Sequence, residues 1–282
     1  MDQLDETIRS GVVARLDKIT ELLPELGQML IELQKGDLEI DSKTTSVDLV
    51  TKADYASEQR LLAYLRAHFP EDGIVTEEGS SSESEVARSG GFRWVLDPID
   101  GTVNYANGLP GWVVSIALMH GLTRVGGIVD APLLNERFRA ILGEGATLNG
   151  ARICVNNKTR LNQGIIGTGF PYDRAQRAEP ISRALANMLR ESGGVRRLGA
   201  AALDMCYVAA GRFVGYYEMS LKPWDSAAAT LIAEEAGGQI SDLAGGPADI
   251  FQSSGIVVSN GLVHSDLVDA LGPMLEAVAI EV

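Results

Sequence analysis

Asp97 and Asp100 stand three residues apart at the end of an apolar run, and Gly101 and Thr102 follow them. Pro98 stiffens the chain between the two acids, so we expect a buried strand that runs into a tight turn and points both carboxylates at one centre. Like charges gathered in this way repel each other. A hard divalent cation such as Mg²⁺ relieves that repulsion, because it prefers carboxylate and carbonyl oxygens as ligands. The segment therefore predicts a magnesium site.

The residues after the second aspartate supply what a phosphate group needs. Gly101 lets the backbone approach an anion closely, and Thr102 can open a helix whose free N–H groups face that anion. Other acids occupy similar places: Glu77 and Glu78 follow an apolar run, and Asp225 starts a predicted helix. Carboxylates, a metal ion and a backbone amide cradle together predict metal-assisted hydrolysis of a phosphate ester.

The composition and the missing motifs disfavour several other classes of protein. The 24 Lys and Arg against 38 Asp and Glu give a formal net charge of −14, so we expect neither a nucleic-acid nor an anionic membrane partner. The three histidines do not have a zinc-binding spacing. The Gly-x-Ser-x-Gly turn of serine hydrolases and the Gly-x-x-x-x-Gly-Lys-Ser/Thr loop of nucleotide-binding proteins do not occur. The first residues lack the basic and apolar blocks of a secretory signal, so we expect a cytoplasmic protein.

Two helices are expected in the N-terminal part of the chain. Apolar residues at three- and four-residue steps predict the first over residues 4–33, with Pro24 ending or kinking it. The second is predicted over residues 54–68, where Thr51 and Asp54 also fit a helix capping pair. Short β-rich runs joined by tight turns then predict a sheet with antiparallel neighbours, over residues 73–76, 92–96, 112–119, 124–129 and 138–142.

The C-terminal half alternates between strands and helices, which favours α/β layering. Strands are predicted at residues 164–169, 195–198, 213–218, 239–241 and 255–258, and helices at 179–191, 200–210, from 225 and at 265–278. The polar residues 80–91 indicate a mobile loop and not a linker between domains. We therefore expect α/β layers with mixed sheets in a single compact unit over residues 1–282, with sublobes at about 1–150 and 151–282.

These motifs resemble the signatures of a known family. Glu77-Glu78, Asp97-Pro98-Ile99-Asp100-Gly101-Thr102 and Trp224-Asp225-Ser226-Ala227-Ala228 look like three signatures of the inositol monophosphatases, a Mg²⁺-dependent and Li⁺-sensitive phosphatase superfamily. Similar segments at residues 48–54, 143–150 and 235–242 extend the resemblance over nearly the whole chain. It implies a layered α-β-α-β-α sandwich of the inositol monophosphatase and fructose bisphosphatase type, usually as a homodimer.

The resemblance also implies a set of metal ligands. Glu77, Asp97 and the Ile99 carbonyl would hold a first Mg²⁺. Asp97, Asp100 and Asp225 would hold a second, and Glu77 would help to place a weaker third ion. Two or three Mg²⁺ ions per active site are therefore expected.

Catalytic and phosphate-binding roles follow from the same resemblance. Glu77 and Thr102 would orient the attacking water, and Thr102 would be hydrogen-bonded to Asp54. The backbone amides of Asp100, Gly101 and Thr102 would bind the phosphate group. Asp54 thus has two interpretations, as a helix cap and as a member of a catalytic dyad, and the resemblance favours the dyad.

The substrate-binding residues come from the C-terminal half. Glu218 and the turn of Gly199, Ala200 and Ala201 match positions that contact polyol hydroxyls in family members. The sequence departs from the family pattern at Ala200, where Ser or Thr is common, so one hydroxyl contact is lost.

The implied function is a Mg²⁺-dependent phosphomonoesterase that hydrolyses a small polyol or sugar phosphate, with inositol 1-phosphate as the expected substrate. Fructose 1,6-bisphosphate, histidinol phosphate and 3′-phosphoadenosine nucleotides are alternatives within the same superfamily, and a non-catalytic binding protein with this fold is a further one. A haloacid dehalogenase phosphatase is disfavoured, because its motif separates the two aspartates by one residue. Here Pro98 and Ile99 both intervene.

Overall fold

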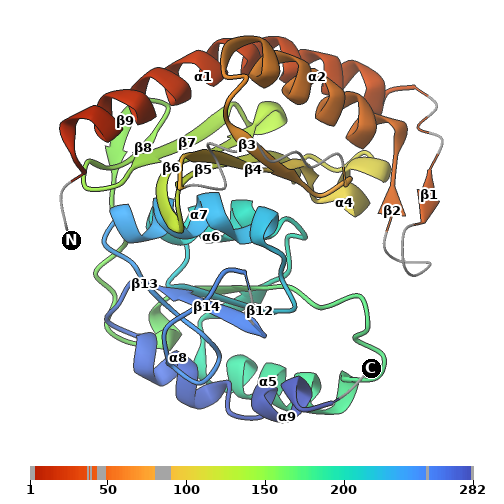
Figure 1. The fold of residues 1–282 in the computed structure, drawn as a ribbon. Coiled ribbons are helices and arrows are strands. Elements are labelled where there is room, and N and C mark those ends of the chain that lie inside the picture. The colour runs from red at the N-terminus through yellow and green to blue at the C-terminus, as the bar shows by residue number, and fades with distance from the viewer. Residues whose placement is uncertain are drawn as a thin grey trace.

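The computed structural model describes residues 4–36, 38, 40–42, 49–79, 90–251 and 254–280. These residues form five stacked layers, in which helices alternate with two sheets (Figure 1). The predicted α-β-α-β-α sandwich with mixed sheets is confirmed. Residues 80–89 of the predicted loop and Asp48 of one family-like segment lie outside the described residues.

The first layer consists of α1 (Glu6–Gln34) and α2 (Lys52–His68), which pack side by side on the larger sheet (Figure 1). The prediction that Pro24 could end the first helix is wrong, because α1 continues through it. Pro24 removes one backbone donor, but Leu23, Leu26 and Leu30 are buried on both sides of it and hold the helix on the core.

The larger sheet has seven strands in chain order, β3 to β9. The strands β3 and β4 are parallel and every later pair is antiparallel, which confirms the expected antiparallel neighbours. The last two strands are short and lie among glycines and asparagines, so their apolar pattern was too brief to predict them. The bounds are β3 (Gly73–Thr76), β4 (Phe92–Asp100), β5 (Val113–His120), β6 (Thr123–Ala131), β7 (Glu136–Ile141), β8 (Gly145–Leu148) and β9 (Ala151–Ile153).

The second sheet has five strands in the order β11-β10-β12-β14-β13. The strand β10 is parallel to both of its neighbours, whereas β14 is antiparallel to β12 and β13. A separate two-stranded ladder, β1 (Asp41–Ser42) with β2 (Leu49–Val50), precedes α2. The bounds of the five strands are β10 (Ile165–Thr168), β11 (Gly194–Arg196), β12 (Gly215–Met219), β13 (Gln239–Ser241) and β14 (Gly255–Ser259).

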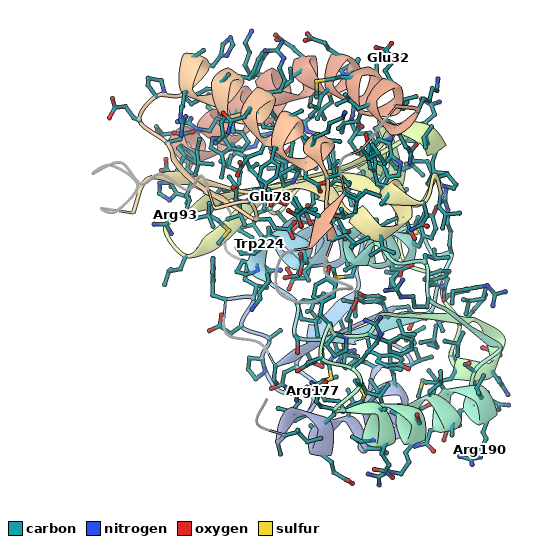
Figure 2. All side chains as sticks on the ribbon, turned by 90° about the vertical axis from the view of Figure 1, so that its right-hand side faces the viewer. Glu32, Glu78, Arg93, Arg177, Arg190 and Trp224 are labelled. Atoms are coloured by element: carbon teal, nitrogen blue, oxygen red, sulfur yellow. The ribbon has the colours of Figure 1, made fainter. Side chains whose placement is uncertain are left out.

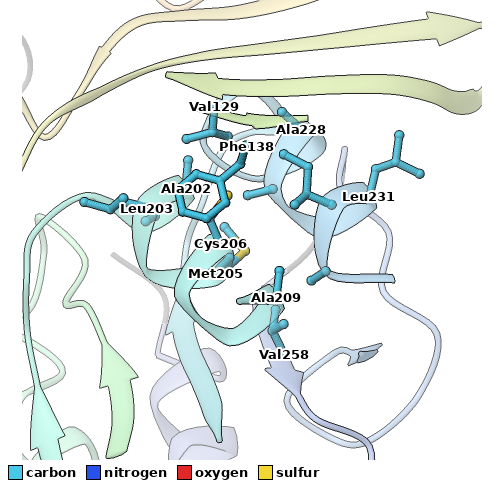
Figure 3. Packing of buried hydrophobic residues seen from close by; sticks show 14 of the residues in the cluster. Val129, Phe138, Ala202, Leu203, Met205, Cys206, Ala209, Ala228, Leu231 and Val258 are labelled. Atoms are coloured by element: carbon cyan, nitrogen blue, oxygen red, sulfur yellow. The ribbon is translucent and has the colours of Figure 1, made fainter. Parts of the chain in front are cut away.

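The middle layer consists of α6 (Ala201–Ala209) and α7 (Pro223–Glu235), which lie between the two sheets (Figure 1). Small residues let the layers approach closely: a Cβ atom on Gly127 of β6 would lie 2.9 Å from the Ala228 carbonyl oxygen of α7. Figure 3 shows Phe138 of the upper sheet and Val258 of the lower sheet on opposite sides of α6. The core around the middle layer is therefore continuous from one sheet to the other.

The last layer consists of α5 (Ala178–Glu191), α8 (His264–Ala270) and α9 (Met274–Val278) below the second sheet (Figure 1). The single helix predicted over residues 265–278 is wrong, because the helix breaks at Gly272 and restarts after Pro273. Proline cannot donate the hydrogen bond that would continue the first helix. Within the described residues no helix has the length and apolar character that crossing a membrane requires.

Candidate metal and phosphate site

Asp97 and Asp100 lie in a bulged part of β4 and not in a turn after it. Asp97 pairs with Ser115 of β5, and Asp100 pairs with Val113. The chain of β4 thus advances by three residues where β5 advances by two. Pro98 cannot donate to the ladder, so the pairing shifts at this point. The predicted turn is thus corrected to a bulge, which still keeps both aspartates in a buried strand, with exposed fractions of 2% for Asp97 and 8% for Asp100.

Parallel pairing brings Glu77 to the same place. The strands β3 and β4 pair in parallel with Thr76 opposite Leu96, and the backbone N–H of Glu77 donates to the Leu96 carbonyl at 3.3 Å. The next residue on each strand is an acid, Glu77 on one and Asp97 on the other. The register of one ladder therefore places these two carboxylates side by side.

Asp225 reaches this region from the start of α7. Its Oδ2 atom accepts the backbone N–H of Lys222 at 2.7 Å, and an acid in the first turn also suits the positive end of the helix dipole. Figure 2 labels Trp224, the chain neighbour of Asp225, where the middle helices begin. The Glu77 charge also acts directly on Asp225, raising its pKa.

The site carboxylates disfavour one another's ionisation. Burial raises the pKa of Asp97 well above its ordinary value, and the negative charges of Glu77, Asp100 and Asp225 raise it further. Burial and the Asp225 charge likewise raise the pKa of Asp100. Burial and then the Glu77 charge raise the pKa of Asp225 to about 8. A cation bound among these oxygens would reverse each of these effects.

The chemistry of the donors fits Mg²⁺, although a finished coordination shell is not present. Among the described residues, no three His, Cys, Asp or Glu side chains already stand in an arrangement that could hold a metal ion. The carboxylates instead accept backbone N–H groups: Asp97 Oδ1 accepts from Ile99 at 3.0 Å, and both oxygens of Asp100 accept from the start of α6. The donors are buried hard oxygens that lie beside one another, and Mg²⁺ prefers such oxygen ligands.

The phosphate turn, residues 100–102, has the backbone that the sequence predicted. Gly101 has φ +92°, a left-handed conformation that favours glycine, and it precedes the short helix α4 (Thr102–Ala106). A Cβ atom there would lie 2.9 Å from the Gly111 carbonyl oxygen and 3.2 Å from the Gly199 carbonyl oxygen. Conformation and crowding therefore both require glycine at this position.

Asp54 serves as a helix cap and also contacts Thr102. Its Oδ2 atom accepts the Thr51 backbone N–H at 2.8 Å and the Thr51 hydroxyl at 2.7 Å, which completes the capping box of α2. The Thr102 hydroxyl lies 3.1 Å from Asp54 Oδ1 and 3.0 Å from the Ile99 carbonyl oxygen, and it can donate to either. The cap and the predicted dyad contact are therefore both present.

The substrate turn, residues 199–201, lies directly on the phosphate turn. A Cβ atom on Gly101 would lie 3.1 Å from the Ala200 Cβ. Asp100 stabilises the contact between the two turns, because its carboxylate accepts hydrogen bonds from the N–H groups of Ala201 at 3.2 Å and Ala202 at 2.7 Å. Since Ala200 has no side-chain oxygen, Asp100 provides the cap that α6 lacks. This capping role of Asp100 was not predicted from the sequence. The signal that could have indicated it is that Ala200, at the start of α6, has no side chain able to cap the helix.

Glu218 lies at the same end of α6, on β12. The Tyr216 hydroxyl donates a hydrogen bond to Glu218 Oε2. The Glu218 carboxylate covers the backbone of Gly169, where any added Cβ would overlap it. Burial raises the pKa of Glu218 to about 7. Burial and then the Glu218 charge raise the pKa of Asp204 to about 8. Tyr216, Gly169 and Asp204 were not predicted from the sequence, because their partners come from other elements.

A five-layer sandwich with an acidic, glycine-containing phosphate turn is the architecture of a class of metal-dependent phosphatases. A model of the inositol monophosphatase family matches residues 14–274 of this chain. The chain therefore belongs to the inositol monophosphatase family, as the sequence motifs predicted.

Individual relatives agree with this assignment. A protein of Pasteurella multocida named Nus factor SuhB is 39% identical over 244 residues, which cover 86% of this chain and 89% of the relative. The solved IMPase of Thermotoga maritima has a TM-score of 0.84 and 32% identity, and the match covers 94% of this chain and all of that chain.

One solved relative was crystallised with ligands of the predicted kind. An IMPase/NADP phosphatase complexed with Mg²⁺ and phosphate has a TM-score of 0.79 and 26% identity to this chain. The match covers 92% of this chain and 95% of that one. Divalent metal use is thus a property of this fold family, and the number of ions in this chain stays a prediction.

Proposed function

We propose that this chain is a Mg²⁺-dependent phosphomonoesterase that hydrolyses a small polyol phosphate, with inositol 1-phosphate as the first candidate substrate. One observation carries the proposal: the left-handed Gly101, between the acids of β4 and the helix α4, lies against the substrate turn. A phosphate on Gly101 would have carboxylates on one side and a binding surface for its alcohol on the other.

The proposed ligands of the ions are Glu77, Asp97, the Ile99 carbonyl, Asp100 and Asp225. When bound, Mg²⁺ supplies positive charge to the phosphate oxygens and the leaving oxygen and makes water a better nucleophile. The raised pKa values of Asp97 and Asp225 support this role, because burial and the neighbouring carboxylates cause them, and at Asp225 the Lys222 charge offsets these effects only in part.

Thr102 is the proposed orienting group for the attacking water. Its single hydroxyl proton is donated to Asp54 or to the Ile99 carbonyl, so the lone pairs of its oxygen are left to accept a hydrogen bond from water. Asp54 fixes the rotation of that hydroxyl, and the capping box holds Asp54 in turn. Glu77, which lies beside Asp97 in the β3–β4 register, would accept a hydrogen bond from the other O–H group of the same water and take that proton as the water attacks.

The polyol is proposed to bind at the substrate turn and Glu218. The phosphate would lie on the amides of residues 100–102, and backbone groups of residues 199–201 would contact the alcohol. Glu218 can accept hydrogen bonds from ring hydroxyls, while Ala200 offers no hydroxyl of its own. The acids Glu218 and Asp204 lie at this end, but the Arg197 charge acts on both of them, so the charges here do not rank fructose 1,6-bisphosphate against a monophosphate.

The experiment is a phosphate-release assay over a panel of esters with and without Mg²⁺ and Li⁺. The panel is inositol 1-phosphate, fructose 1,6-bisphosphate, histidinol phosphate and a 3′-phosphoadenosine nucleotide. Asp97→Asn is expected to lower kcat/KM about a thousand-fold, which corresponds to several kcal/mol of transition-state stabilisation. Asp130→Asn is the matched control, since Asp130 is also a buried aspartate of this sheet but pairs with Arg137 at 2.6 Å.

Two outcomes would contradict the proposal. Equal activity of Asp97→Asn and the wild type would remove Asp97 from the mechanism. Release of phosphate from none of the esters would favour a non-catalytic role for this fold, an alternative that also suits the name Nus factor carried by the curated relatives.

A further inference from the structure

Asn104 joins three segments that are distant in the sequence. It lies in α4, two residues after Thr102, with an exposed fraction of 5%. Its side-chain amide nitrogen donates to the Gly111 carbonyl oxygen at 2.5 Å and to the Leu198 carbonyl oxygen at 2.7 Å. We refer to these two hydrogen bonds as the Asn104 bridge. One amide group thus ties α4 to the chain before β5 and to the chain before α6.

The bridge acts on the substrate turn, because Leu198 is the residue before Gly199. Gly199 has φ +93°, and a Cβ atom there would lie 3.1 Å from both the nitrogen and the oxygen of the Asn104 side chain. The Leu198 backbone also acts on Asp204, lowering the pKa of that carboxyl, which places Asp204 beside the start of the turn. The turn therefore packs directly on the Asn104 amide and has little freedom to shift.

The same bridge sets the surroundings of the phosphate turn. The Gly111 and Gly199 carbonyl oxygens are the groups that crowd Gly101, and Asn104 holds Gly111 directly and Gly199 through its neighbour. Asp100 adds a second tie through the amides of Ala201 and Ala202. Two side chains of the segment 100–104 therefore fix the spacing between the phosphate turn and the substrate turn.

We propose that Asn104 is a positioning residue that sets the spacing between the phosphate turn and the substrate turn, and so adapts the site to phosphate esters of a polyol ring. The inference rests on the proposed function and adds a specificity determinant to it. An amide suits this position because its NH₂ group can donate to two carbonyl oxygens at once. An aspartate of the same shape would direct a charged oxygen at both carbonyls.

The test compares two substrates in three variants. Asn104→Asp removes the donors without changing the shape, and Asn104→Ala is the second variant in case the first does not fold. Asn107→Ala is the matched control, because Asn107 is an exposed asparagine of the same helical segment whose amide donates only to the Val103 carbonyl, at 2.8 Å. KM and kcat are measured with Mg²⁺ for inositol 1-phosphate and for p-nitrophenyl phosphate, which lacks ring hydroxyls.

Both Asn104 variants are expected to raise KM for inositol 1-phosphate about tenfold, in line with the loss of two hydrogen bonds. KM for p-nitrophenyl phosphate and inhibition by inorganic phosphate are expected to change by less than about threefold, since the phosphate turn keeps its own backbone. Asn107→Ala is expected to match the wild type. An equal rise of KM for both substrates would overturn the proposal.

A second readout does not depend on activity. Amide hydrogen exchange of residues 199–202 is expected to be faster in both Asn104 variants than in the wild type and in Asn107→Ala. Unchanged exchange would overturn the proposed positioning. If the wild type hydrolyses no ester, the proposed function fails, and this exchange measurement alone then decides whether Asn104 holds the substrate turn.

Discussion

Two buried acidic groups of this molecule are built in opposite ways. The Asp72 carboxylate, below the first helical layer, accepts hydrogen bonds from Arg15 Nε and Nη2 at 2.8 Å each. It also accepts one from Trp94 Nε1 at 2.9 Å. Arg15 itself lies 3.8 Å from the centre of the Phe92 ring. Asp97 and Asp100 have other carboxylates as neighbours, and within the described chain no Lys or Arg forms an ion pair with either.

The difference separates an acid that stabilises the fold from the acids that we propose as metal ligands. A buried carboxylate with a bidentate arginine is compensated within the protein. A buried carboxylate beside others is destabilised until a cation arrives. Removal of the charge should therefore destabilise the protein at Asp72 and leave it unchanged or more stable at Asp97, and the following predictions test this.

The largest effect is expected at the compensated acid. Asp72→Ala should lower the free energy of unfolding by about 3 kcal/mol, because it leaves the Arg15 guanidinium and the Trp94 N–H without their partner. Urea denaturation measures this loss. Glu25→Ala is the control: Glu25 also pairs with an arginine, Arg60 at 2.8 Å, but the pair is exposed and should change stability by about 0.5 kcal/mol or less. Equal losses in the two variants would contradict the comparison.

Mg²⁺ should stabilise the molecule through the uncompensated acids. At about 100 times its Kd, the ion is expected to raise the free energy of unfolding by about 2.7 kcal/mol. Denaturation with and without Mg²⁺ measures the gain. Asp97→Asn should abolish it and Asp130→Asn should retain it. A gain of the same size in Asp97→Asn would place the ion elsewhere.

Without Mg²⁺, Asp97→Asn should be neutral or stabilising by about 1 kcal/mol. The amide keeps an oxygen that can accept the Ile99 N–H and removes a charge from a crowded, buried place. The urea midpoint in EDTA is the measurement. A loss of more than about 1 kcal/mol would mean that the Asp97 charge is already compensated in the free protein.

The smallest effect is a pH dependence of the Mg²⁺-free protein. Burial and Glu77 hold the pKa of Asp225 at about 8 in the folded state, far above its unfolded value. Such a group loses its contribution to stability as the pH rises from its unfolded pKa to about 8, so the Tm should fall between about pH 6.5 and 8 and level off above that. Asp204, with a pKa of about 8, acts in the same direction. Burial lowers the pKa of His264, so its contribution changes below this range.

In the Asp225→Asn variant, the Tm is therefore expected to fall less with rising pH than in the wild type. In excess Mg²⁺, the Tm of the wild type is expected to fall less still. Thermal scans across this pH range in EDTA and in Mg²⁺ provide the measurement. A Tm that rises with pH in EDTA would show that the site acids are not the groups that titrate.

The elements with strong periodic patterns were predictable from the sequence, as α1 and α2 illustrate. The bulge at Pro98 was not, because the same four residues suit a turn until the partner strand β5 is known. The roles of Asp100 at α6 and of Asn104 were also missed, since their partners are about a hundred residues away in the chain. The Li⁺ sensitivity, the homodimer, the cytoplasmic location and the two sublobes stay predictions.

The alanine-rich middle layer limits how this protein can diversify. The helices α6 and α7 are enclosed by sheets on both faces, and Ala202, Ala209 and Ala228 have no exposed surface. A larger side chain at these positions would force two sheets apart at once. Enlarging one of these alanines is therefore expected to destabilise the packing on both faces of the middle layer and not on one face alone.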